Sequence, residues 1–154
     1  MLIGVISDTH GLLRPEALEA LRGSEHIIHA GDIGAPEIVP RLEQIAPVSA
    51  IRGNIDNAPW ARQFPETRVV TLAGMTIYVI HDVHSLDLDP KAAGFVALIS
   101  GHSHRPNEEV SDGVLYFNPG SAGPKRFNLP ISVGKLDLTG GQLNATIVEL
   151  RLGR

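Results

Sequence analysis

The 154-residue sequence predicts an α/β fold with two β-sheets and helices outside them. In the first third of the chain, apolar runs alternate with amphipathic segments, a pattern typical of parallel strands joined by right-handed crossovers. Further on, apolar runs are separated mainly by glycine-containing turns. The last runs alternate apolar and polar residues, as antiparallel strands with one solvated face do. The length favours a single domain, residues 1–154.

The first third contains three predicted strands and two predicted helices. The first strand is a continuous, β-branched apolar run, as expected when both faces are buried. The first helix has Pro15 in its first turn and Gly23 after its end. In the second helix Pro40 follows Pro36 by four residues, so Pro40 either fits in the first turn or shortens the helix. The predicted order is strand 2–6, helix 15–22, strand 26–30, helix 35–46 and strand 48–53.

The remainder of the chain predicts mainly strands. Gly74 separates two of them as a hairpin, and Gly140-Gly141 marks another turn. Residues 90–94 predict a short helical turn at best. The predicted strands are 68–74, 75–81, 95–101, 113–120, 130–140 and 141–152.

Composition excludes several kinds of function. The chain has no cysteine, so disulfides, thiolate metal sites and cysteine nucleophiles are excluded. A net charge of −4 and few aromatic residues disfavour binding to a long nucleic acid. No apolar stretch approaches the ~20 residues of a membrane span, and the N-terminus lacks the features of a signal peptide. We therefore expect a cytoplasmic protein that does not enter a membrane.

Polar, metal-competent side chains follow five predicted strands. A single such residue after a strand is usually a turn or capping residue. Several at one sheet edge would be costly to desolvate without a compensating ion, and that edge is where open α/β sheets bind ligands. The mixture of imidazole and carboxylate suits two Mn, Fe, Zn or Ni ions. The candidate ligands are Asp8, His10, Asp32, Asn54, His81, His102 and His104.

Spacing within two of these segments suggests how the ligands meet. Asp8 and His10, like His102 and His104, are two positions apart. Side chains two positions apart lie on one side of an extended backbone, so each pair is expected to point the same way.

The ordered set Asp8-x-His10, Gly31-Asp32, Gly53-Asn54-x-Asp56, His81 and Gly101-His102-x-His104 resembles the motifs of the calcineurin-like metallophosphoesterases. It is most similar to their small single-domain bacterial and archaeal phosphodiesterases. The segment 118–126, NPGSAGPKR, resembles the C-terminal signature of that branch. The resemblance extends from residue 4 to about residue 134.

The resemblance implies a four-layer α/β/β/α sandwich of two mixed sheets and a dinuclear metal centre. Asp8, His10, Asp32 and His104 would hold one ion. Asp32, Asn54, His81 and His102 would hold the other, with Asp32 as the bridge. The implied activity is hydrolysis of a small phosphodiester by a metal-bound hydroxide, with manganese the favoured metal and nickel, iron or zinc as alternatives. Asp32 and Asn54 are also predicted to be catalytic.

Two departures from the family pattern lie near the predicted centre: one is at Ile55, and the other is HDVHS at 81–85, where relatives often have His-Gly. Larger members carry a histidine after the metal-binding asparagine, and here that position is Ile55. His84 is the predicted replacement as acid, although a solvated loop position is the simpler interpretation. Asp82 is expected to orient His81.

Two further interpretations stay open. The retromer scaffold subunit resembles this fold but serves as a protein-interaction module, so a non-catalytic scaffold is the alternative function. Trp60 and Phe64 could form a lid or an interface, which leaves homo-oligomerisation possible. His29, inside a predicted strand, is expected to be a hydrogen-bonded core residue. Lys125 and Arg126 could contact a phosphate or be solvated.

Overall fold

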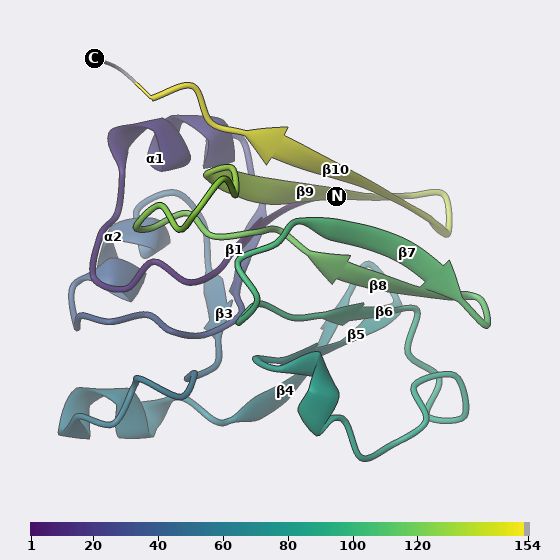
Figure 1. Cartoon of the computed structure of the whole chain (residues 1–154). Coiled ribbons are helices and arrows are strands. Elements are labelled where there is room, and N and C mark those ends of the chain that lie inside the picture. The colour runs from purple at the N-terminus through teal and green to yellow at the C-terminus, as the bar shows by residue number, and fades with distance from the viewer. Residues whose placement is uncertain (153–154) are drawn as a thin grey trace.

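Two five-stranded sheets stack face to face, and both α-helices lie against the outer side of the first sheet (Figure 1). The computed structural model describes residues 1–152. In the first sheet β1, β2 and β3 are parallel, β9 is antiparallel to β1, and β10 is antiparallel to β9. Its order is β10 (Gln142–Glu149), β9 (Ser132–Thr139), β1 (Leu2–Ile6), β2 (His26–His29) and β3 (Val48–Ala50).

The second sheet combines a parallel centre with antiparallel edges. Strands β5, β6 and β8 are parallel, whereas β4 pairs with β5, and β7 with β8, in antiparallel fashion. Its order is β4 (Thr67–Leu72), β5 (Met75–Ile80), β6 (Ala97–Ile99), β8 (Val114–Asn118) and β7 (Asn107–Ser111).

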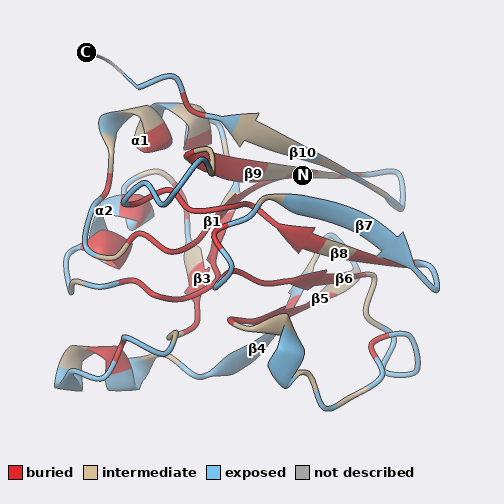
Figure 2. Ribbon diagram, viewed as in Figure 1, coloured by how far each residue is buried: buried red, intermediate tan, exposed pale blue. Residues whose placement is uncertain are grey.

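Three apolar clusters separate the layers. Helices α1 (Pro15–Leu21) and α2 (Ile38–Glu43) pack on the first sheet, with Leu21 and Leu42 fully buried. Between the sheets, side chains such as Val5 and Phe117 form the central cluster. Central strands are therefore buried almost throughout, whereas β7 is exposed along its whole length (Figure 2).

The outer side of the second sheet carries no α-helix within residues 1–152. The 3-10 helix η2 (Val83–Ser85) and the loop after it cover part of this side, where Leu86, Leu88 and Phe95 pack against Tyr78. The other 3-10 helix, η1 (Pro59–Gln63), precedes β4. The predicted α/β class with two mixed sheets is confirmed, with a loop-built fourth layer.

Several predicted bounds differ from the structure. The second helix begins at Ile38 and spans six residues, so Pro40 lies in its first turn, and residues 90–94 form a turn. The strand at 107–111 was not predicted at all. The remaining strands and α1 are present, mostly one to three residues shorter at an end. The predicted single domain extends to residues 153–154, which lie outside the described residues.

Candidate metal centre

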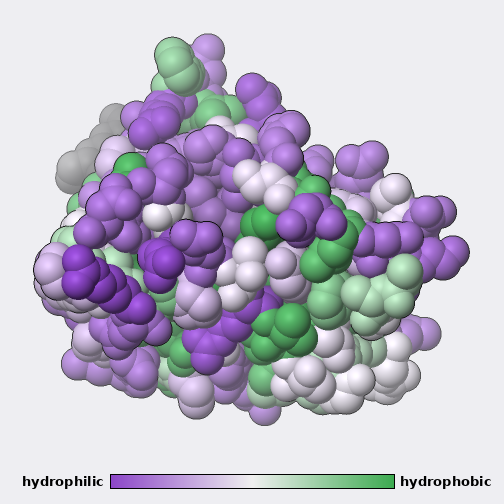
Figure 3. All heavy atoms as spheres, turned by 90° about the horizontal axis from the view of Figure 1, so that it is seen from below, coloured by the Kyte–Doolittle hydropathy of each residue, from purple (hydrophilic) through white to green (hydrophobic). Residues whose placement is uncertain are grey.

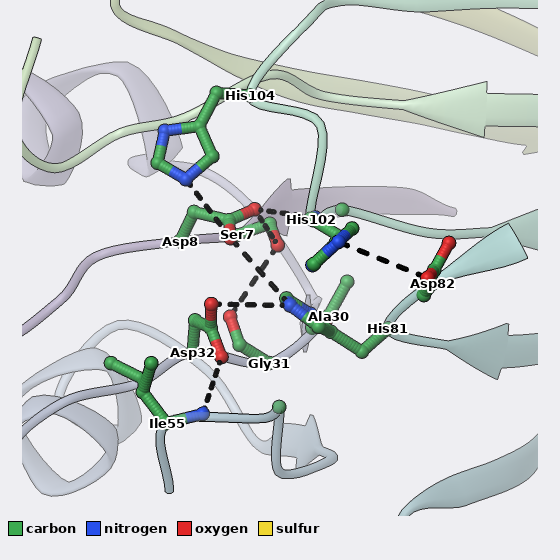
Figure 4. Close-up of polar contacts among 12 residues, drawn as sticks. Ser7, Asp8, Ala30, Gly31, Asp32, Ile55, His81, Asp82, His102 and His104 are labelled. Carbon is green, nitrogen blue, oxygen red and sulfur yellow. Dashed lines mark hydrogen bonds and ion pairs between the residues drawn. The ribbon is translucent and has the colours of Figure 1, made fainter. Parts of the chain in front are cut away.

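Six of the seven predicted ligands form two clusters at the edge of the sandwich. One cluster is Asp8, His10 and His104, and the other is Asp32, His81 and His102. Within each cluster the candidate ligand atoms all lie within 4.8 Å of one another. Loops following β1 and β2 of the first sheet and β5 and β6 of the second supply them, so the site straddles both sheets (Figure 4).

The two clusters touch through their carboxylates. Asp32 Oδ2 lies 3.5 Å from His10 Nε2 of the other cluster. Asp8 Oδ1 likewise lies 3.8 Å from His81 Nε2. Two ions held by these clusters would therefore share a carboxylate-lined space.

Hydrogen bonds to Asp8 hold one carboxylate oxygen and leave the other free. Asp8 Oδ2 accepts from the Ser7 hydroxyl at 2.8 Å and from the His102 N–H at 3.0 Å. Asp8 Oδ1 has no hydrogen-bond partner, although the residue is fully buried. The Nε2 atoms of His10, His81 and His104 lie 3.5 to 3.8 Å from this oxygen.

The two carboxylate oxygens of Asp32 also have different surroundings. Its Oδ1 accepts from the Ile55 N–H at 3.2 Å, and its Oδ2 faces the imidazoles. Burial acts to raise the pKa of Asp32, but contact with His81, the Ile55 N–H and the charge of His10 outweigh it and lower the pKa overall. Asp32 is thus a carboxylate at neutral pH, as a metal ligand must be.

Ala30 fixes the tautomer of His81. The His81 Nδ1–H donates to the Ala30 carbonyl at 2.7 Å, so Nε2 carries the lone pair and faces Asp32 at 3.2 Å. Burial acts to lower the pKa of His81, yet the contacts with Asp32, Asp8 and the Ala30 carbonyl raise it overall. The predicted orientation by Asp82 is wrong, because Asp82 Oδ2 instead lies 3.8 Å from His102 Nε2.

Four buried side-chain atoms lack a hydrogen-bond partner within the described residues, and every one belongs to a predicted ligand. They are Asp8 Oδ1, His10 Nε2, His81 Nε2 and His104 Nδ1. Unpartnered buried polar atoms are rare and costly, and three of these four converge. Mixed nitrogen and oxygen donors in this arrangement fit divalent transition-metal ions.

Five predicted ligands adopt a left-handed backbone conformation. The φ angles are 56° at Asp8, 47° at His10, 56° at Asp32, 70° at His102 and 61° at His104. The expected extended loops are therefore wrong. His102 and His104 also turn to different clusters, so only the Asp8–His10 pair points the same way. Non-glycine residues in this region are uncommon and concentrate at functional sites.

Two glycines allow the loops to approach one another. A Cβ at Gly53 would collide with the carboxylate and backbone of Asp32. A Cβ at Gly101 would collide with the Ser7 hydroxyl and lie 2.6 Å from Asp8 Oδ2. Larger residues at either position would displace a candidate ligand.

His84 belongs to neither cluster, and Asn54 offers an amide rather than the carboxylate and imidazole groups that define them. Asn54 is exposed and lines a groove of about 540 Å³ that also reaches His81 and His102. The side chain of His84 is 91% exposed, with Nδ1 3.2 Å from Asp82 Oδ1, and it does not line that groove. The roles of both residues stay predictions.

Two buried residues, Asp56 and Asn118, brace the loops. Asp56 accepts N–H groups from Ile33, Gly34 and Gly53, and so acts in the structure as a loop brace. Asn118 donates to the Gly101 carbonyl at 2.9 Å. Sequence reasoning missed both bracing roles, since a carboxylate or amide after a strand does not reveal which N–H or carbonyl it will meet.

His29 has the predicted core role. Its Nδ1 accepts from the Gly31 N–H, and its Nε2 contacts the Thr9 hydroxyl at 3.0 Å. Full burial lowers the pKa of His29 to about 4, although the charges of Asp8, Asp56 and Asp32 act to raise it. His29 therefore stays neutral at physiological pH.

Comparisons with known proteins agree with this geometry. Residues 1–141 match the model of the calcineurin-like phosphoesterase superfamily domain. A probable metallophosphoesterase of Methanothermobacter thermautotrophicus is 37% identical over 161 residues, which cover 97% of this chain and 92% of the relative.

Solved structures share the fold. An archaeal phosphodiesterase superposes with a TM-score of 0.79 at 24% identity, over 96% of this chain and 100% of that one. Vps29 of Entamoeba histolytica, determined in complex with zinc, superposes with a TM-score of 0.73 at 23% identity, over 97% and 99% of the two chains. The match over residues 1–141 and the 37% identical relative show that this chain belongs to the calcineurin-like phosphoesterase superfamily.

Proposed function

We propose that the protein is a phosphodiesterase with a dinuclear metal centre. Asp8, His10 and His104 would hold one ion and His81, His102 and Asn54 the other, with Asp32 bridging them. The observation that carries this proposal is the set of unpartnered buried atoms on predicted ligands, joined by contacts between the two clusters.

Two divalent ions in this position would neutralise the phosphate charge and activate a water for attack on phosphorus. The chain itself supplies orientation. Ser7 and the His102 N–H hold Asp8, the Ile55 N–H holds Asp32, and the Ala30 carbonyl holds His81. These contacts keep one carboxylate oxygen of Asp8 and of Asp32, and Nε2 of His81, directed at the proposed centre. Manganese is the proposed metal, with nickel, iron or zinc as alternatives.

The groove beside the second cluster supports diesters over monoesters. At about 540 Å³ it has room for the second organic substituent of a small diester. The one arginine that lines it, Arg52, already donates to the Phe64 carbonyl and to Glu66. A monoester dianion would therefore find no free cation in the groove.

Metal analysis combined with two aryl esters tests the proposal. The purified protein should contain about two transition-metal ions per chain and hydrolyse bis(p-nitrophenyl) phosphate faster than p-nitrophenyl phosphate. Asp32→Asn should weaken both sites and remove most of the activity, because one oxygen of the bridge is lost. A protein that binds no metal under any loading condition, or binds metal without hydrolysing either ester, would instead support the scaffold alternative.

A further inference from the structure

The groove beside the second cluster has an apolar floor and polar walls. Tyr78 and Ile80 of β5 line it, and both are largely buried. Asp82, Ser85 and Asp87 of the loop after β5 line it as well, as do Asn54 and Asn57. His81, which is 6% exposed and has an unpartnered Nε2, connects the groove to the metal centre.

Carboxylates dominate the charge of this groove. Among its lining residues, Glu66, Asp82 and Asp87 are acidic and Arg52 is the only lysine or arginine. Arg52 pairs with Glu66 at 3.3 Å, so no lysine or arginine of the lining is left to offset Asp82 and Asp87. Within residues 1–152 Asp87 has no ion-pair partner, and it is exposed to the groove solvent.

Cations near the centre lie elsewhere. Burial is the main cause that lowers the pKa of His104, and the charge of nearby Arg126 also lowers it. Arg126 does not line the groove. The face seen from below carries many hydrophilic side chains, with apolar residues in smaller groups (Figure 3). The environment of the proposed centre is thus asymmetric in charge.

We infer that the protein prefers phosphodiesters whose second substituent is a small cation, and that Asp82 and Asp87 select it from the groove. The phosphate monoanion would lie at the metal centre, and the cationic substituent over Tyr78 and Ile80, facing the carboxylates. An anionic substituent would be repelled by the same pair. This inference rests on the proposed phosphodiesterase function.

Three p-nitrophenyl phosphodiesters that share one leaving group isolate the effect of charge. Their second substituents are 2-(trimethylammonio)ethyl, its neutral isostere 3,3-dimethylbutyl, and 2-carboxyethyl. At low ionic strength kcat/KM should be about five- to tenfold higher for the cation than for the isostere, and lowest for the anion, as expected for two carboxylates acting through solvated groove walls. The preference should shrink toward unity at 1 M salt.

Asp87→Asn keeps the size of the side chain and removes one groove charge. It should reduce the preference, measured as the ratio of kcat/KM for the cationic probe to kcat/KM for the neutral isostere, to about two- to threefold. Glu43→Gln, an equal charge change on α2 away from the groove, should leave the preference as in wild type.

The outcomes separate the two proposals. If the metal-loaded protein hydrolyses none of the three probes, the phosphodiesterase function fails and this inference fails with it. If it hydrolyses the neutral isostere without preferring the cation, or if Asp87→Asn leaves the preference intact, the function stands and the inference is overturned.

Discussion

Replacing Asp56 by asparagine should destabilise the protein more than any ordinary surface change. Asp56 is 3% exposed. Its Oδ2 accepts from Ile33 at 3.0 Å and from Gly53 at 2.8 Å, and its Oδ1 accepts from Gly34 at 3.0 Å. In Asp56→Asn one oxygen can still serve two N–H groups, but the new amide group would face the third N–H, donor against donor.

The magnitude follows from those three bonds. One buried hydrogen bond is lost and two lose their assistance from charge, which together cost about 2–4 kcal/mol of the free energy of unfolding. Urea unfolding of the metal-free protein at pH 7 measures this change directly. Because Gly53 immediately precedes Asn54, the variant should also bind metal more weakly.

Asp112→Asn provides the matched control. Asp112 is exposed, with a φ of 53° in the turn between β7 and β8, a conformation that asparagine adopts as readily. It should change the free energy of unfolding by less than about 0.5 kcal/mol. A loss that small for Asp56→Asn as well would refute the bracing role.

Four further predictions concern the site and its surroundings. The pKa of His29 is about 4 in the folded state against 6.5 ordinarily, so the stability it contributes is complete above pH 6.5 and lost as the pH falls to 4. Urea unfolding should show a loss of roughly 3 kcal/mol in the free energy of unfolding across that window. His29→Gln should remove this part of the pH dependence. Gly53→Ala should lower the number of bound metal ions in elemental analysis, since its Cβ meets Asp32, and full metal content would contradict the close approach. Chelation of metal should abolish phosphodiester hydrolysis, and added Mn²⁺ should restore it; activity that survives exhaustive chelation would exclude a metal mechanism. Since Ile55 cannot donate a proton, rates on aryl methyl phosphates should depend steeply on the pKa of the leaving group; a series shallow in wild type and steep in His84→Ala would identify His84 as the acid.

Sequence reasoning succeeded where hydrophobic pattern decides structure. The buried strands β1 and β6 are continuous apolar runs and were predicted, as was β2, an apolar pair between His26 and His29. Strand β7 was missed because NEEVS is exposed throughout and carries no apolar periodicity. The Asp112-Gly113 pair, a strong hairpin signal, could have revealed it. In α2, Pro36 falls before the helix, which therefore starts later than predicted.

The candidate site was predicted by residue type and missed in conformation. Six of the seven proposed ligands fall into the two clusters, because strand ends gather at one edge whatever the loop geometry. The left-handed backbone at Asp8 and His10 could not be predicted, since the polar residues that tolerate it also occur in ordinary turns. Bracing by Asp56 and Asn118 depends on loops more than 15 residues apart in the sequence.

The left-handed backbone at the predicted ligands lowers the stability of the fold, but it is where the candidate ligand groups are attached. Each such residue lowers the free energy of unfolding by about 1–3 kcal/mol relative to a glycine at the same position, and aspartate lies toward the lower end of that range. Glycine at His10 or His104 would relieve that cost and at the same time remove an imidazole. Without a bound metal, glycine at such positions would stabilise the fold, so the five side chains are retained in this chain at a conformational cost.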